Sequence, residues 1–257
     1  MSFVDLDASL KDWPYHPDRI SVRKIRTEQG EIKIQQRVEL GIMQMEVDGR
    51  PDGGRPHDCD TLLDYQQRRM AEYERRNGTV IGFSITPEEC RDLREEASLY
   101  YRRYVASFVL EEFDRVVRDT GHNLAILDFL RDHADEGEER NRLEAFRPYI
   151  LMMQARGNAH QAIREGHAES ALAHVNRALM SIRAYYDGTD HPELYDECEE
   201  VKILEQMRSR IGGQVSVNPV SMMREALKAA IAEERFEEAA RLRDELDKLG
   251  KQRVSEG

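Results

Sequence analysis

The long helical stretch that begins at Thr86 constrains the fold of this chain more than any other part of its sequence. Thr86-Pro87-Glu88-Glu89 combines an N-cap threonine, a proline at the first helical position and a glutamate at the third, which together favour a helix start. From there to Gly212, nearly every segment has apolar residues at three- and four-residue steps. Short breaks, among them Gly166 and Asp187-Gly188, divide the stretch into several helices. The sequence therefore predicts a mostly helical body.

The N-terminal region has a different period. Residues 3–13 have helical spacing and are expected to form a short helix that ends at Pro14. Ser21 to Thr27 and Glu31 to Leu40 are typical of half-buried strands, with a hairpin turn between them, and Ile42 to Val47 follows as a third strand. We therefore predict a small antiparallel β-meander, with the first helix as one candidate to cover its apolar face. The expected fold class is α+β, mostly α.

Within the helical stretch, one turn pattern recurs. Phe113, Ala168 and Phe236 each open a helix that follows an apolar helix and a short break. We also assign Tyr101, Val105, Phe108 and Val109 to one apolar stripe. The copy with Ala162, Gly166, Ala171 and Ala178, within residues 148–187, resembles a tetratricopeptide unit. That resemblance implies a concave helical surface that binds a peptide or protein. The alternative is an ordinary helical bundle built from αα-hairpins.

The C-terminal segment has two matched apolar faces. Leu227 and Ala230 belong to the first, and Ala239, Leu242 and Leu246 belong to the second. Two short helices with such faces are typical of an αα-hairpin, and we expect Phe236 to pack between them. A hairpin of this size cannot bury a sufficient core alone, so it favours contact with a partner.

This segment, about residues 220–249, resembles the UVR motif of the B and C subunits of the bacterial excision-repair excinuclease and of Clp-type chaperone–protease adaptors. The resemblance implies protein–protein contact through a helical hairpin, although Glu234 stands where the family usually has leucine. The implied partner is another UVR-bearing protein or a chaperone–protease, and a homodimer through the hairpin is a further expectation. An unrelated Ala-rich terminal helix is the alternative. The partner-binding residues implied by the resemblance are Leu227, Ala230, Phe236, Glu237, Ala239, Ala240, Leu242, Arg243, Asp244 and Leu246.

The Gly- and Pro-rich segment from Asp48 to Asp60 is the most loop-like part of the chain. Its candidate ligand residues are Arg50, Asp52, Arg55 and His57, which would form an anion clamp or a metal loop. The alternative is a stiff surface connection whose charges pair with each other. The spacing of its histidine, cysteine and aspartates matches no known metal-ligand pattern, so we expect no metal and no cofactor.

Composition excludes several classes of function. The formal net charge is −12 over 257 residues, and no basic stripe is present, so direct nucleic acid binding is not expected. No apolar run is long enough for a membrane span, and the N-terminus lacks the apolar core of a signal peptide. Cys59, Cys90 and Cys198 are widely spaced and odd in number, which favours a reducing cytoplasm.

Familiar catalytic and nucleotide-binding motifs are absent from the sequence. We therefore predict a cytoplasmic, non-catalytic adaptor that recruits a protein partner. One alternative is an accessory factor of nucleotide excision repair that acts through UVR contacts. Another is a small ligand-binding protein or enzyme that uses the loop from Asp48 to Asp60. The expected division of the chain is a β-meander module at 1–60, a helical body at 61–211, a linker at 212–219, the hairpin at 220–249 and a tail at 250–257.

Overall fold

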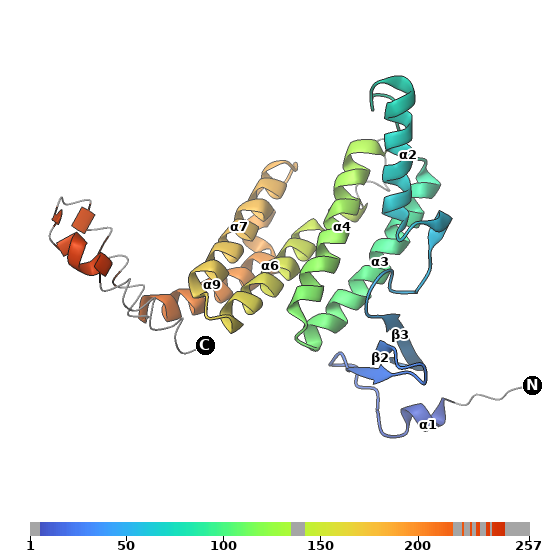
Figure 1. Ribbon diagram of the computed structural model, residues 1–257, viewed down its shortest axis with the longest axis horizontal. Helices are drawn as coiled ribbons and strands as arrows, with labels where there is room; N and C mark the ends of the chain where they lie inside the picture. The colour runs from blue at the N-terminus through green and yellow to red at the C-terminus, as the bar shows by residue number, and fades with distance from the viewer. Residues whose placement is uncertain are drawn as a thin grey trace, which may run out of the picture.

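The computed structural model describes residues 6–134, residues 142–217 and, nearer the C-terminus, residues 223, 227, 230, 231, 235, 236 and 238–244. Side chains are described in these ranges except at 7, 8 and 214–217. As predicted, the fold is α+β and mostly helical: a small sheet near the N-terminus precedes a succession of helices (Figure 1).

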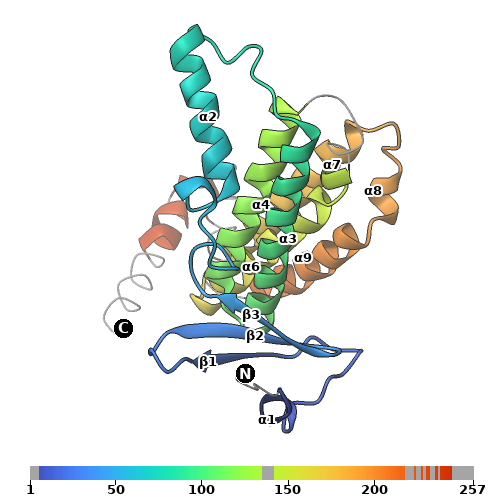
Figure 2. The same ribbon diagram turned by 90° about the vertical axis from the view of Figure 1, so that its right-hand side faces the viewer.

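The sheet is the predicted antiparallel meander, with strands β1 (Val22–Arg26), β2 (Ile32–Val38) and β3 (Gly41–Glu46) in chain order. Ile34 lies opposite Met45, and both side chains are buried. They pack against Ala106, near the end of helix α3 (Pro87–Val109). The sheet therefore rests on the helical body through its apolar face (Figure 2).

The first helix does not cover that apolar face. Helix α1 (Asp7–Leu10) is shorter than the predicted 3–13, and residues 3–5 are outside the described part of the chain. Trp13, which follows α1, stacks under the guanidinium of Arg23 at 4.1 Å and donates a 2.6 Å hydrogen bond to Ser21. Arg23 pairs across the strands with Gln35, so the N-terminal segment lies on the polar face of the sheet.

Successive helices of the body pack against one another as hairpins (Figure 1). The predicted start of α3 is confirmed, because Thr86 and Glu89 form a complete capping box. The predicted starts at Phe113 and Ala168 are confirmed as well. The remaining elements are η1 (Pro56–Asp58), α2 (Leu62–Asn77), α4 (Phe113–His133), α6 (Arg147–Arg164), α7 (Ala168–Asp187), α8 (Leu194–Glu197) and α9 (Glu199–Val217).

Two apolar clusters form the core of the helical body. One joins α2, α3 and α4 through residues such as Leu93 and Ile126, and the other joins α6, α7 and α9 through residues such as Ile182 and Leu204. At Gly157 on α6, an added Cβ would lie 3.1 Å from Val117 and 3.3 Å from a backbone oxygen of α4. Glycine therefore permits the close approach of α4 and α6.

Two details of the helical prediction are wrong. Tyr101 is 45% exposed and Val109 is also exposed, whereas Tyr100 and Tyr104 are buried, so the apolar stripe of α3 lies on a different face. Residues 212–217 of the predicted linker are helical, because α9 continues to Val217. The tetratricopeptide resemblance and the division into domains stay predictions.

The hairpin of α6 and α7 offers a direct test of the packing. Ala171 is completely buried between these helices. Ala171→Leu is therefore expected to overpack the contact and to lower the free energy of unfolding by about 1–3 kcal/mol. Ala184→Leu on the exposed face of α7 is the matched control, with an expected change within about 0.5 kcal/mol. If urea denaturation gives the same free energy of unfolding for the two variants, the register assigned to helix α7 is wrong.

Among the described residues, no helix has the length and apolar character needed to cross a membrane.

Candidate protein-interaction surfaces

The described residues of the C-terminal segment form a small cluster with its own buried centre. Ala230, Ala239 and Leu242 are buried, and Met223 and Leu227 pack against them. The backbone amide of Arg235 donates a 2.8 Å hydrogen bond to the carbonyl of Ala230, at the point where the chain turns. Small side chains at 230 and 239 bring the two parts of the segment together, as the hairpin prediction requires.

Phe236 does not pack between the helices. Its side chain is 69% exposed, so the prediction that it packs between the two helices of the hairpin is wrong. It lines a shallow depression with Arg235, Glu238 and Arg241, and Arg235 forms an ion pair with Glu238. An exposed aromatic ring with charged neighbours is typical of a contact surface.

The structure places the other predicted partner-binding residues around this cluster. Ala240 is exposed, next to the buried Ala239. Arg243 and Asp244 are exposed and pair with each other at 3.0 Å. Glu237 and Leu246 lie outside the described residues. The segment therefore combines a buried side made of small and aliphatic residues with an exposed side that carries Phe236.

The loop from Asp48 to Asp60 does not gather its four candidate ligand residues into one site. Arg50 pairs with Asp52 at 2.9 Å, whereas Arg55 pairs with Asp60 at 3.0 Å. His57 stacks on the ring of Tyr65, with ring centroids 3.9 Å apart. These internal contacts favour a stiff connection over an anion clamp. Ligand binding by this loop stays a prediction.

The loop is fixed to the body by a buried carboxylate that the sequence analysis missed. Glu96 on α3 is completely buried. One of its oxygens accepts hydrogen bonds from Arg50 at 3.0 Å and from the amide of Leu62 at 2.7 Å, and the other accepts from the amide of Leu63 at 3.2 Å. His122 on α4 lies 3.2 Å from the same carboxylate. Glu96 thereby holds the start of α2, where free amides favour a negative charge.

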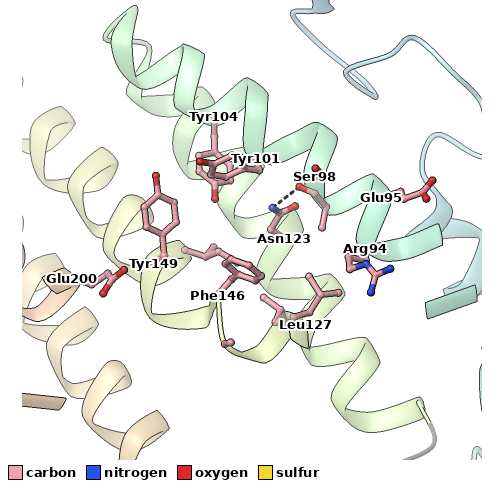
Figure 3. Close-up of a pocket in the computed structure, with 14 residues that line it drawn as sticks. Arg94, Glu95, Ser98, Tyr101, Tyr104, Asn123, Leu127, Phe146, Tyr149 and Glu200 are labelled. Carbon is pink, nitrogen blue, oxygen red and sulfur yellow. Dashed lines mark hydrogen bonds between the residues drawn. The ribbon is translucent and has the colours of Figure 1, made fainter. Parts of the chain in front are cut away.

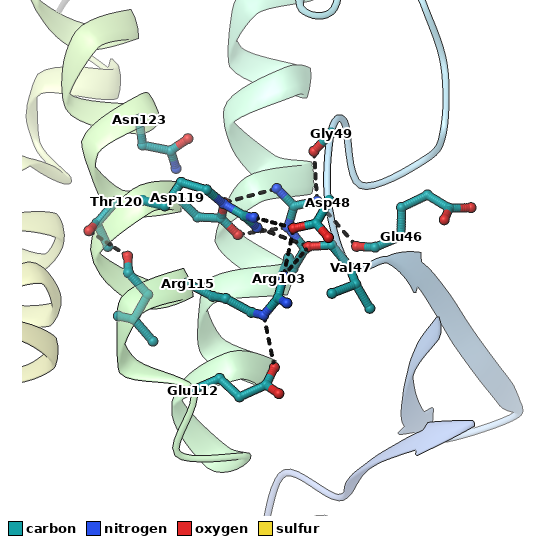
Figure 4. Close-up of polar contacts among 12 residues, drawn as sticks. Glu46, Val47, Asp48, Gly49, Arg103, Glu112, Arg115, Asp119, Thr120 and Asn123 are labelled. Carbon is teal, nitrogen blue, oxygen red and sulfur yellow. Dashed lines mark hydrogen bonds and ion pairs between the residues drawn. The ribbon is translucent and has the colours of Figure 1, made fainter. Parts of the chain in front are cut away.

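A second buried charge fixes the end of the sheet (Figure 4). Arg103 is 1% exposed and binds Asp119 on α4 through two nitrogens, at 2.7 and 2.8 Å. Its remaining nitrogen donates to the carbonyls of Glu46 and Gly49, at 3.1 and 2.7 Å. Four of its five N–H groups are therefore used, which gives a buried guanidinium most of the hydrogen bonds that it requires.

Asp48 adds an exposed part to this network. Arg115 and Arg118 both donate to its carboxylate, at 2.7 and 2.8 Å, and both also donate to the carbonyl of Val47. Burial raises the pKa of Asp48, but the hydrogen bonds from the two arginines outweigh it, so the pKa lies below its ordinary value. Arg115 and Arg118 therefore bind groups of the protein itself, and they are less available to bind an external anion.

A pocket of about 870 Å³ opens among α3, α4, α6 and the start of α9 (Figure 3). Its lining is mainly apolar and aromatic, and Tyr101 and Tyr149 are neighbours in it, with ring centroids 6.0 Å apart. Burial and a hydrogen bond with Tyr101 are among the causes that raise the pKa of Tyr149 to about 12, so its hydroxyl stays protonated at neutral pH.

The pocket was not foreseen from the sequence, because Tyr101 was assigned to the core. The sequence did contain a signal for an exposed ring. Tyr100 and Tyr101 are adjacent in a helix, so only one of the two rings can point into the contact between helices. Among the described residues, no group of three His, Cys, Asp or Glu side chains is arranged to hold a metal ion. Cys59, Cys90 and Cys198 are buried, and none of the three is in a disulfide.

A model of the protein family described as the UvrB/uvrC motif matches residues 220–252. The chain therefore carries a UVR motif near its C-terminus, and the resemblance noted in the sequence is confirmed. No curated protein and no solved structure matches this chain.

Proposed function

We propose, on the basis of the UVR motif, that this chain is a non-catalytic adaptor that recruits a protein partner through the hairpin at 220–249. UVR motifs mediate contacts between proteins, which supports a protein partner in general terms. The observation that carries the proposal is the exposed ring of Phe236 within the matched residues. A motif that buries small residues and exposes its phenylalanine offers an anchor for another protein.

The chemistry of this surface favours a protein contact. The charged residues Arg235, Glu238 and Arg241 line the same depression as the ring of Phe236, and Ile231, five residues earlier, is also exposed. Interfaces typically combine an apolar or aromatic centre with a polar rim, and a few central residues supply most of the binding energy. The partner we propose is another UVR-bearing protein or a chaperone–protease in the cytoplasm. Pairing of two hairpins into a homodimer is part of the same proposal.

Phe236→Ala is expected to remove partner capture without opening the hairpin. Because the ring is largely exposed, its loss leaves the cluster of Ala230, Ala239 and Leu242 intact. Truncation of a central aromatic contact at an interface commonly costs about 2 kcal/mol or more of binding energy, which is at least about thirtyfold in affinity. The measurement is affinity capture by the full chain and by the variant, with bound proteins quantified by mass spectrometry.

The matched control is Met180→Ala, which removes an exposed apolar side chain from α7. It is expected to capture the same proteins as the unmodified chain. A version that ends at Gly212 should lose the same partners as Phe236→Ala. An unchanged set of partners after that truncation would contradict the adaptor proposal, and sedimentation of the full chain would report the homodimer separately.

The second candidate function is an accessory role in nucleotide excision repair, which the UVR motif itself favours. Because the chain carries a net charge of −12 and two arginines of α4, Arg115 and Arg118, pair with Asp48, we expect it to act through protein contacts and not by direct binding to DNA. No binding to a random-sequence duplex is therefore expected at about 0.15 M salt, measured by fluorescence polarisation. Micromolar binding that weakens steeply with salt would contradict the charge argument and support direct contact with DNA.

A further inference from the structure

A row of basic side chains runs along α6, on the face that meets the turn between α3 and α4. Arg156, His160 and Arg164 are spaced four residues apart, so they share one face of the helix. The guanidinium of Arg156 lies over the ring of Phe108 at 4.3 Å, and that of Arg164 lies over the ring of Phe113 at 4.6 Å. The imidazole of His160 stacks on Phe113, with ring centroids 4.9 Å apart. We call these three residues of α6 the basic stripe.

Arg164 already has an anionic partner. It forms an ion pair with the side chain of Glu111 and donates a 2.8 Å hydrogen bond to the carbonyl of the same residue. Glu111 lies in the turn between α3 and α4, where it adopts a positive φ of 58°. Arg164 is therefore used to hold this turn.

Arg156 has no such partner in the described part of the chain. Its side chain is half-buried, and its Nη1 meets the sulfur atoms of Met152 and Met153, at 3.8 and 3.6 Å, which are weak acceptors. Loss of water on burial lowers the pKa of Arg156 below its ordinary value. None of the described carboxylates pairs with it. A half-buried charge without a counter-charge destabilises the protein, so this position favours a ligand that supplies an anion.

The free edge of Arg156 suits a carboxylate. Its Nη1 faces the sulfur atoms, which leaves Nε and Nη2 without an acceptor among the described residues. Neither nitrogen belongs to the buried side-chain atoms that lack a hydrogen bond, so both are open to solvent. These two nitrogens form one edge of the guanidinium and can donate two parallel hydrogen bonds to one carboxylate. The buried Arg103 uses the same edge to bind Asp119, at 2.7 and 2.8 Å.

A second arginine without a counter-charge lies near the stripe. Helix α9 contacts α6 (Figure 1), and Arg210 on α9 is exposed and forms no ion pair with the described residues. Burial is the largest cause that lowers the pKa of His160 below its ordinary value, and Arg156, Arg164 and Arg210 lower it further. The carboxylate of Glu111 opposes them. An anion bound here would therefore meet two arginines and a histidine that gains a proton more easily in its presence.

This local charge decides which anion the stripe can hold. At about 0.15 M salt, charges further away than about 8 Å are largely screened, so the net charge of −12 does not prevent local binding of an acidic group. Two arginines are too few to hold a nucleic acid duplex, which needs many phosphate contacts. A phosphate group carries three acceptor oxygens and nearly two charges, and it would call for the third arginine, Arg164, which Glu111 already occupies. The two open donors of Arg156 match the two oxygens of a carboxylate.

We propose that the basic stripe and Arg210 together bind an acidic segment of another protein, with one carboxylate on the Nε and Nη2 edge of Arg156 and a second carboxylate near Arg210. His160 lies on the same face of α6 as Arg156 and becomes protonated when the segment binds. The site is separate from the UVR hairpin and does not depend on the proposed recruitment through Phe236.

The probe for this site is a fluorescein-labelled hexaglutamate peptide, with hexaglutamine as its neutral counterpart. Binding to the full chain is measured by fluorescence polarisation at about 0.05 M salt, where screening is weaker than at about 0.15 M. Hexaglutamate is expected to bind about tenfold or more tightly than hexaglutamine. Absence of hexaglutamate binding, or equal binding of the two peptides, would overturn the proposal.

Arg156→Met locates the site. The variant is expected to bind hexaglutamate about tenfold or more weakly, while its melting temperature stays the same or rises, because the substitution removes a half-buried charge without a partner. Arg177→Met is the matched control: Arg177 on α7 is exposed, lies near His174 and forms no ion pair in the described chain, so the net charge changes equally. Equal affinities of these two variants would overturn the proposal, as would a lower melting temperature of Arg156→Met with unchanged binding.

Arg210→Gln tests the second contact at an exposed position where folding is not at risk. It is expected to weaken hexaglutamate about threefold or more. Phe236→Ala should bind the peptide as the unmodified chain does, so a failure of the hairpin proposal is distinguishable from a failure of this one. Loss of binding in Phe236→Ala, with Arg156→Met unaffected, would assign the acidic segment to the hairpin and overturn the proposal.

The pH dependence of binding reports on His160. A bound anion favours the imidazolium, so the pKa of His160 rises in the complex and the affinity should increase as the pH falls from about 8 to about 6, where glutamate stays ionised. His160→Gln should lose this dependence. An affinity with the same pH dependence in both proteins would overturn the placement of the segment beside His160.

Two competing ligands complete the test. Inorganic pyrophosphate that displaces hexaglutamate at a lower concentration than unlabelled hexaglutamate does would assign the stripe to phosphate groups and overturn the choice of an acidic segment. If unlabelled hexaglutamate dissociates a dimer of the full chain in sedimentation, the acidic segment belongs to a second copy of this chain, which would overturn the assignment to another protein.

Discussion

Replacement of Arg103 by methionine is expected to lower the free energy of unfolding by about 3–5 kcal/mol. The substitution leaves the carboxylate of Asp119 buried, with Arg118 as its remaining cation at 2.9 Å. It also removes the donors that serve the carbonyls of Glu46 and Gly49. Urea denaturation monitored by circular dichroism measures the loss of free energy of unfolding. The slope of this free energy against urea concentration should not change.

Arg131→Met is the matched control for that experiment. Arg131 forms ion pairs with Asp128 and Asp132 on the exposed surface of α4, where such pairs contribute about 0–1 kcal/mol. A double variant, Arg103→Met with Asp119→Leu, should regain part of the lost stability, because it removes the uncompensated buried charge. Equal losses in Arg103→Met and Arg131→Met would mean that the buried network contributes nothing beyond a surface ion pair.

Glu96→Gln is expected to have a comparable effect of about 3–5 kcal/mol, together with local opening of the chain. The neutral amide no longer balances Arg50, and its NH₂ group replaces one of the two oxygens that accept hydrogen bonds, so the backbone amide of either Leu62 or Leu63 loses its acceptor. The connection from Asp48 to Asp60 should therefore become more sensitive to protease than in the unmodified chain. Urea denaturation and limited proteolysis with mapping of the cleavage sites measure the two effects.

The neighbouring residue supplies the control. Glu95 is exposed on the same helix, and Glu95→Gln should change the stability by no more than about 0.5 kcal/mol. If Glu96→Gln keeps both the stability and the protease resistance of the unmodified chain, the buried carboxylate does not anchor α2.

Helix starts and turns were predictable where the residues that determine them lie close together in the sequence. Thr86 and Glu89 lie three residues apart and form a capping box in the structure, and Gly30 and Gly166 adopt the positive φ that their turns require. The start of α7 at Ala168 follows directly from the break at Gly166. The chain itself supplies both partners of each of these interactions within a few residues, so the sequence pattern alone indicates them.

Burial was less predictable, because it depends on which neighbour a helix meets. Tyr100 and Tyr101 are adjacent residues of the same type. Contacts with the rest of the body nevertheless bury the ring of Tyr100 and leave that of Tyr101 exposed. Phe236 was expected to pack between the helices of the hairpin because it follows the predicted turn. The small side chains of Ala230 and Ala239 instead form the buried contact, and the ring lies outside it.

The buried charges were the least predictable feature. Arg103 and Asp119 are separated by 16 residues, and Arg103 and Glu46 by 57. Acidic and basic residues interleaved along helices usually face solvent, so the pattern gave no reason to place Glu96, Arg103 or Asp119 inside the protein. Only the packing of α3 against α4 and the sheet creates the surroundings in which these charges are buried.

The attachment of the sheet to α3 and α4 bears on how the chain can be shortened. A fragment that starts at residue 61 would retain Arg103, Arg115 and Arg118 but lose every backbone carbonyl that they bind in the N-terminal region. It would also expose Ala106, which the sheet covers. The boundary between residues 60 and 61 thus separates two patterns of sequence, whereas we expect the smallest independently folding unit to contain both.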